Sequence, residues 1–155
     1  MAFNNGEQNR ELNQYWYSES TIKALCEEIK LHGHKVAFLS TTSLYFAFPE
    51  EERKNFKLFE YDRQWEKDPG FVFYDFNHPE KIPVSLWNSF DYIVVDPPFI
   101  TKEVWEKYIS AMTTLGKRKS ATSEVESHPD FKCLWTTVLE NHGMLENCLD
   151  CALFI

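Results

Sequence analysis

The segment Asp96-Pro97-Pro98-Phe99 has the residue types and the order that most clearly indicate chemistry in this sequence. Its two prolines fix two backbone φ angles and remove two N–H donors, so the segment is rigid and rich in hydrogen-bond acceptors. The Asp96 carboxylate and the proline carbonyls can accept two N–H hydrogens from an amine and leave its lone pair pointing outward. The ring of Phe99 can pack against the group that carries the amine. The segment therefore predicts an acceptor site for an amine, although the same four residues also form ordinary turns at strand ends.

The stretches of chain around this segment predict a parallel sheet. Uninterrupted apolar runs, such as residues 35–41 and 90–95, are typical of strands that are covered on both faces. Helical patterns separate them, the first over residues 19–31 after the N-cap residue Ser18. This alternation predicts an α/β fold with a mostly parallel, twisted sheet and helices on both faces. The expected strands are 35–41, 56–62, 71–76, 90–95, 131–138 and 151–155, and the expected helices are 19–31, 43–47, 101–115 and 140–149.

Polar side chains stand at the carboxyl ends of four of these predicted strands. In a parallel sheet those ends lie along one edge, and ligands bind outside that edge, near the point where the strand order reverses. Acidic residues at two other strand ends favour the chemical interpretation of the Asp96 segment over the simple turn. The residues concerned are Ser40, Thr41, Glu60, Asp62, Asp75 and Asp96.

Length and charge limit the classes of function. The 155 residues suffice for one domain, and 24 acidic against 16 Lys and Arg side chains give a formal charge of −8. This charge disfavours a general nucleic-acid binder and suits a basic protein partner. No apolar run is long enough to span a membrane, and the N-terminus lacks a secretory pattern. The spacing of the cysteines predicts free thiols rather than a metal site. We therefore expect a cytoplasmic protein with no membrane segment and no bound metal. The cysteines are Cys26, Cys133, Cys148 and Cys151.

Four motifs in order resemble a known family. Asp-Pro-Pro-Phe is similar to the (D/N/S)-P-P-(Y/F) motif of class I amino-methyltransferases, which use S-adenosyl-L-methionine to methylate a nitrogen. The runs QYWYS (14–18), FEYD (59–62), FVFYDFNHP (71–79) and FDYIVVDPPF (90–99) resemble one eukaryotic subfamily, first described as adenine-N(6) DNA methyltransferase-like. Its members include the lysine methyltransferase of translation elongation factor 1-alpha. The resemblance covers residues 14–115 closely and the rest loosely.

The resemblance implies a binding site for S-adenosyl-L-methionine. By analogy, Glu60 binds the ribose hydroxyls, as acidic strand-end residues do in dinucleotide folds. Asp75 accepts a hydrogen bond from the adenine amino group, and Phe76 lies beside the adenine ring. Tyr17 and Ser18 lie near the methionine end of the cofactor.

The resemblance also implies a Rossmann-like class I methyltransferase fold, with two departures. The turn after the first strand, residues 39–44, has no glycine, but Ser40 can contact the cofactor through its hydroxyl and backbone N–H. The chain ends within its sixth predicted strand, so we expect an incomplete C-terminal hairpin. We expect a flexible segment over residues 1–14 and a methyltransferase domain over residues 15–155, with a flexible loop at 116–130.

The function expected from the resemblance is methylation of a lysine of translation elongation factor 1-alpha. In this interpretation Asp96, Pro97, Pro98 and Phe99 hold the amine, and the methyl group passes in line from sulfonium to nitrogen. One alternative is an N(6)-adenine nucleic-acid methyltransferase, which the charge of −8 disfavours. A second alternative is a truncated, non-catalytic member of the fold. We expect a monomer.

Overall fold

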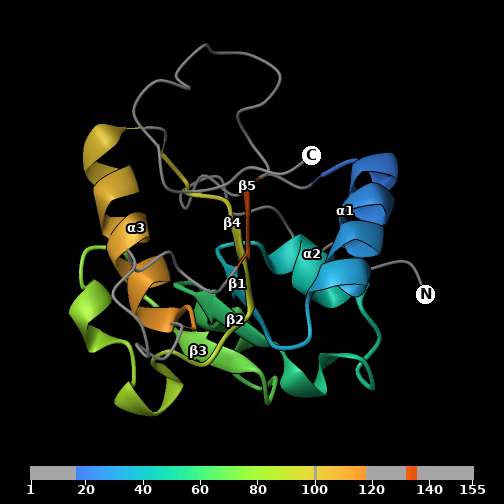
Figure 1. Cartoon of the computed structure of the whole chain (residues 1–155), viewed down its shortest axis with the longest axis horizontal. Coiled ribbons are helices and arrows are strands. Elements are labelled where there is room, and N and C mark those ends of the chain that lie inside the picture. The colour runs from blue at the N-terminus through green and yellow to red at the C-terminus, as the bar shows by residue number, and fades with distance from the viewer. Residues whose placement is uncertain (1–16, 100, 118–131, 136–155) are drawn as a thin grey trace, which may run out of the picture.

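Five parallel strands form one sheet in the computed structural model, which describes residues 17–99, 101–117 and 132–135 (Figure 1). The order across the sheet is β3-β2-β1-β4-β5, and each neighbouring pair is parallel. The order reverses between β1 and β4, so the switch point lies between these two central strands. The strands are β1 (Val36–Leu39), β2 (Lys57–Glu60), β3 (Phe71–Phe73), β4 (Tyr92–Val95) and β5 (Lys132–Trp135).

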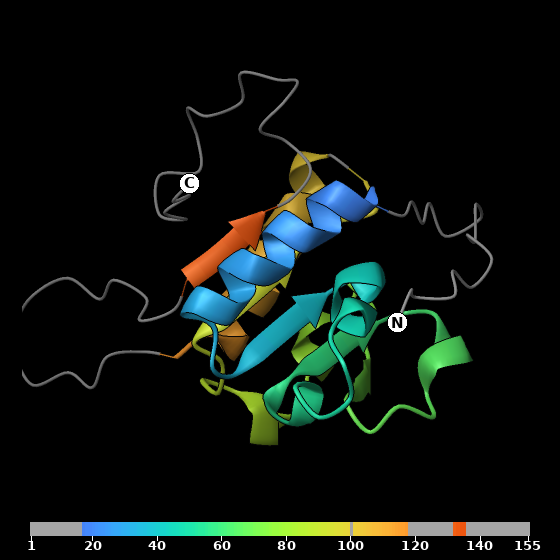
Figure 2. The same cartoon turned by 90° about the vertical axis from the view of Figure 1, so that its right-hand side faces the viewer.

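Helices cover both faces of the sheet, as the sequence predicts. Figure 1 shows α3 (Lys102–Leu115) on one side and α1 (Glu19–His32) and α2 (Thr42–Ala47) on the other. Figure 2 looks onto the face that α1 and α2 cover. None of the described helices is long and apolar enough to cross a membrane.

The central strands β1 and β4 are buried along their whole length and divide the core into two layers. Val36 and Phe38 pack with Ile29 of α1 and with α2, whereas Ala37 and Leu39 pack with α3. This alternation follows from the two-residue period of a strand. The unbroken apolar runs in the sequence therefore reflect burial on both faces.

Helix caps set the predicted helix boundaries. The Ser18 hydroxyl accepts a hydrogen bond from the Thr21 N–H at 3.2 Å, and Gly33 follows the last residue of α1. In α3 the Thr101 hydroxyl caps the Val104 N–H at 3.3 Å. The predicted helices 19–31, 43–47 and 101–115 are confirmed to within one residue.

The connection after β3 differs from the prediction. The expected strand 71–76 ends at Phe73, because the chain turns at Asp75, whose carboxylate accepts a hydrogen bond from the Asn77 N–H at 2.9 Å. Two short 3-10 helices follow, Pro79–Lys81 and Val84–Leu86, where no element was predicted.

The predicted fifth strand is confirmed but shorter, at Lys132–Trp135. The predicted segment 1–14, helix 140–149 and strand 151–155, and all but residues 116 and 117 of the predicted loop, lie outside the described residues.

Candidate active site

Three strand ends converge at the carboxyl edge of the sheet. The Ser40 N–H donates to the Phe59 carbonyl at 2.9 Å, and the Asp96 N–H donates to the Leu39 carbonyl at 3.2 Å. The hydrogen bonds between neighbouring strands therefore continue one residue beyond β1 and β4. This register places Ser40, Asp96 and Glu60 side by side along the edge. The structure thus brings together three of the strand-end residues that the sequence singles out.

Glu60 is a buried carboxylate, with only 6 % of its surface exposed. Its Oε1 accepts the Tyr61 N–H at 2.8 Å and the Asp62 N–H at 3.1 Å, and its Oε2 accepts the Thr42 hydroxyl at 2.8 Å. Burial raises the pKa of Glu60 above its usual value, although these three hydrogen bonds act to lower it. Glu60 is therefore held in one orientation by the two residues that follow β2 and by the first residue of α2.

The turn between β1 and α2 has an unusual backbone. Ser40 adopts φ = 55°, the left-handed conformation that glycine favours, although no glycine is present. Its hydroxyl lies 2.7 Å from the Tyr108 hydroxyl of α3, and burial raises the pKa of Tyr108 well above its usual range. The next residue, Thr41, is buried, and its hydroxyl has no hydrogen-bond partner among the described residues. Strain and an unsatisfied buried hydroxyl in one turn are typical of a ligand site.

Asp96 is half-buried directly after β4 and accepts a hydrogen bond at Oδ2 from the hydroxyl of Tyr17. Tyr17 stands just before α1, 79 positions away in the chain. Its ring packs against the core layer beneath α1 and α2. The residue before the N-cap of α1 therefore contacts the segment Asp96 to Phe99 directly.

Phe99, three residues after Asp96 in the chain, presents an aromatic surface, with 48 % of the residue exposed. Its ring meets that of Phe76 edge-on, with centroids 6.4 Å apart, and Phe76 stacks on Tyr108 at 6.0 Å. Pro97 is buried and Pro98 half-buried. The ring of Phe76, which follows Asp75, therefore contacts the segment Asp96 to Phe99.

Two predicted cofactor residues use their polar atoms locally. The Ser18 hydroxyl caps α1 and also lies 3.0 Å from the Ser20 hydroxyl. The Asp75 carboxylate stabilises its own turn through Asn77. Their cofactor roles stay predictions.

Tyr108 was not predicted as a candidate residue, because its place on the buried, apolar stripe of α3 gives it the pattern of a core residue. A hydroxyl on a buried stripe requires a hydrogen-bond partner, and that signal was present in the sequence.

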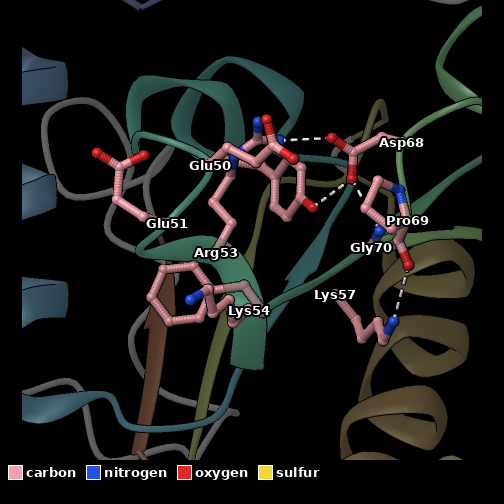
Figure 3. A pocket seen from close by; sticks show the side chains of 10 residues that line it. Glu50, Glu51, Arg53, Lys54, Lys57, Asp68, Pro69 and Gly70 are labelled. Carbon is pink, nitrogen blue, oxygen red and sulfur yellow. Dashed lines mark hydrogen bonds and ion pairs between the residues drawn. The ribbon is translucent and has the colours of Figure 1, made fainter.

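A separate cavity of about 550 Å³ lies at the opposite end of the sheet (Figure 3). It adjoins the start of β2 at Lys57 and the residue before β3, Gly70. Arg53 forms an ion pair with Asp68 at 2.6 Å, and Tyr45 donates to the same carboxylate at 2.6 Å. None of the predicted site residues lines this cavity.

The parallel sheet with helices on both faces is that of a Rossmann-like methyltransferase fold. The chain belongs to the family described as "Probable N6-adenine methyltransferase", whose model matches residues 8–153.

Curated relatives carry more specific names. The "EEF1A lysine methyltransferase 1" of Homo sapiens is 33 % identical over 120 residues, covering 73 % of this chain and 56 % of that protein. A protein-lysine N-methyltransferase of Dictyostelium discoideum is 37 % identical over 114 residues, covering 69 % and 54 %. The "EEF1A lysine methyltransferase 1" of Danio rerio is 34 % identical over 119 residues, covering 70 % and 71 %. The chain thus spans about half the length of the first two relatives. No solved structure matches the chain significantly.

Proposed function

We propose that this chain is an S-adenosylmethionine-dependent N-methyltransferase that acts on a lysine of translation elongation factor 1-alpha. The observation that carries the proposal is the arrangement of the acceptor segment, Asp96 to Phe99, beside Glu60 and the strained turn at Ser40, in a chain of this family. The names of the relatives support lysine as the acceptor.

The residues at the carboxyl edge suit the cofactor. A carboxylate offers about four acceptor positions, and Glu60 uses three of them within the protein. The remaining position on Oε2 can accept a ribose hydroxyl. The Thr41 hydroxyl, which has no hydrogen-bond partner in the described part of the chain, and the left-handed Ser40 support binding of a further polar group at the neighbouring turn. When bound, S-adenosylmethionine supplies an electrophilic methyl group on its sulfonium.

The other predicted cofactor residues complete this proposal. Asp75 and Phe76 would hold the adenine, Asp75 as acceptor and Phe76 as a neighbouring ring. Tyr17 and Ser18 would lie at the methionine end, and the hydrogen bond from the Tyr17 hydroxyl to Asp96 supports a position for Tyr17 near the amine as well.

The acceptor segment would orient the nitrogen. Asp96 and the proline carbonyls accept its N–H hydrogens, so that its lone pair points at the methyl group. A free lysine has a pKa of about 10.4, so its ammonium must first release a proton to solvent, and exclusion of water from the site lowers that pKa. The neutral amine is the nucleophile.

The test has two stages. Calorimetric titration with S-adenosylhomocysteine should show binding by the wild type and loss of affinity in Glu60→Ala. Radiolabelled methyl transfer should then favour elongation factor 1-alpha over a DNA oligonucleotide and fall sharply in Asp96→Asn. Transfer to the oligonucleotide alone would instead support adenine methylation. A folded wild type that binds no S-adenosylhomocysteine would refute the enzyme and leave a non-catalytic member of the fold.

A further inference from the structure

We infer that Tyr17 is a positioning residue for Asp96: its hydroxyl holds the carboxylate in the orientation that accepts the amine. This inference rests on the proposed function and adds a residue from outside the acceptor segment to the same site. It differs from the prediction from sequence, in which Tyr17 serves only the cofactor.

The backbone around Asp96 is already fixed. The Asp96 N–H donates to the Leu39 carbonyl at 3.2 Å, and the ring of Pro97 restricts the chain that follows. What the backbone does not fix is rotation of the carboxylate about its last torsion, which is broad in aspartate. A hydrogen bond to Oδ2 removes that freedom, and the Tyr17 hydroxyl provides it.

Tyr17 is itself held firmly enough to act in this way. Its ring packs against the core layer that contains Phe38, Leu44 and Val94. The next residue, Ser18, begins α1, since its hydroxyl caps the Thr21 N–H and its carbonyl accepts the Ile22 N–H at 2.9 Å. A donor whose ring and backbone are both anchored can fix the group it binds.

Alignment of the amine is the step that this contact would affect. In-line transfer requires the nitrogen to lie within a narrow distance and angle of the methyl group, and small displacements reduce the rate strongly. Because Tyr17 acts through Asp96, removing its hydroxyl should lower kcat and leave affinity for the cofactor product nearly unchanged.

The chain offers a matched control for a Tyr-to-Phe change. The Tyr74 hydroxyl is buried and has no hydrogen-bond partner among the described residues. Tyr74→Phe therefore removes the same atom without breaking a contact, and it should leave kcat, KM and the affinity for S-adenosylhomocysteine unchanged.

The experiment compares Tyr17→Phe, Asp96→Ala, the double variant and Tyr74→Phe. We expect Tyr17→Phe to lower kcat about tenfold with elongation factor 1-alpha as substrate, and to change the Kd for S-adenosylhomocysteine less than about twofold. In the double variant the residual rate should equal that of Asp96→Ala, since the two residues act as one unit. A raised Kd with unchanged kcat in Tyr17→Phe would overturn the inference. So would a double variant in which the rate losses of the two single variants multiply.

Thermal unfolding of the same variants separates this inference from the proposed function. If the wild type transfers no methyl group, the proposed function fails, and the Tm values decide the inference. A smaller Tm loss from Tyr17→Phe in the Asp96→Ala background than in the wild type would support it. Equal losses in both backgrounds would refute it.

Discussion

Replacing Glu60 with Gln is expected to stabilise the protein and, at the same time, to weaken its binding of S-adenosylhomocysteine. The change removes a charge but keeps the shape of the side chain. The carboxamide oxygen can still accept the Tyr61 and Asp62 N–H groups that now reach Oε1. The Thr42 hydroxyl can rotate and accept from the new amide nitrogen.

The stability gain follows from the burial of Glu60, which is only 6 % exposed. Burial raises its pKa in the folded state, so folding favours the neutral carboxyl. The stability that this provides is complete below the usual pKa of about 4.5 and is lost as the pH rises through the folded-state pKa. Gln does not ionise, so the advantage of Glu60→Gln should grow between pH 4 and pH 7. We expect Glu60→Gln to raise the free energy of unfolding by about 1 kcal/mol at pH 7, which corresponds to a rise in Tm of ~4 °C.

The loss of affinity follows from the same charge. A hydrogen bond to a charged acceptor contributes about 1 to 1.5 kcal/mol more than one to a neutral acceptor, which corresponds to about a tenfold increase in Kd.

Thermal unfolding from pH 4 to pH 8 and calorimetric titration measure the two effects. Glu66→Gln is the matched control, because the Glu66 side chain is 57 % exposed, and neither Tm nor Kd should change in it. A lower Tm for Glu60→Gln at pH 7 would refute the argument from burial. An unchanged Kd would refute the assignment of Glu60 to the ribose.

Substitutions at Ser40, Gly70 and Arg53 test the turn after β1 and the cavity beside Lys57. Ser40→Gly relieves the left-handed strain but loses the hydrogen bond to Tyr108 of α3, so its Tm should stay near that of the wild type. Ser40→Ala loses the same hydrogen bond and keeps the strain, so it should lower Tm by ~4 °C. Gly70→Ala forces a methyl group against the Tyr45 hydroxyl, so we expect the free energy of unfolding in urea to fall by about 2 kcal/mol, with part of the loss restored by adding Tyr45→Phe. Arg53→Met leaves Asp68 without its cation, and we expect a loss of about 3 kcal/mol at pH 7. Burial opposes ionisation of Asp68, but hydrogen bonds and Arg53 lower its pKa overall. The stability that ionised Asp68 provides is therefore lost as the pH falls through its folded-state pKa. Arg53→Met should accordingly differ less from the wild type at pH 3 than at pH 7.

Local signals in the sequence were enough to predict most elements of the fold. The apolar run before Asp96 became β4, and the caps Ser18 and Thr101 begin α1 and α3 where expected. Each of these signals depends on residues within one turn or one strand. The strand after Gly70 was predicted too long, because the turn at Asp75 interrupts an aromatic run that otherwise resembles a strand.

The residues of the candidate site were predicted from their positions at strand ends, but their contacts were not. Nothing near Ser40 in the sequence indicates that it takes a glycine-like conformation or meets Tyr108 of α3. The contact between Tyr17 and Asp96 spans 79 positions and depends on how α1 lies over the sheet.

The sequence by itself determined the α/β class, the strands, and the acidic and proline-rich residues that end them, since periodicity, capping and strand burial are local properties. Only the tertiary structure decided which of these residues meet. The strand order β3-β2-β1-β4-β5 brings Glu60, Ser40 and Asp96 to one edge, and the packing of α1 brings Tyr17 to the same place. Such contacts arise from packing among distant segments, and no local pattern encodes them.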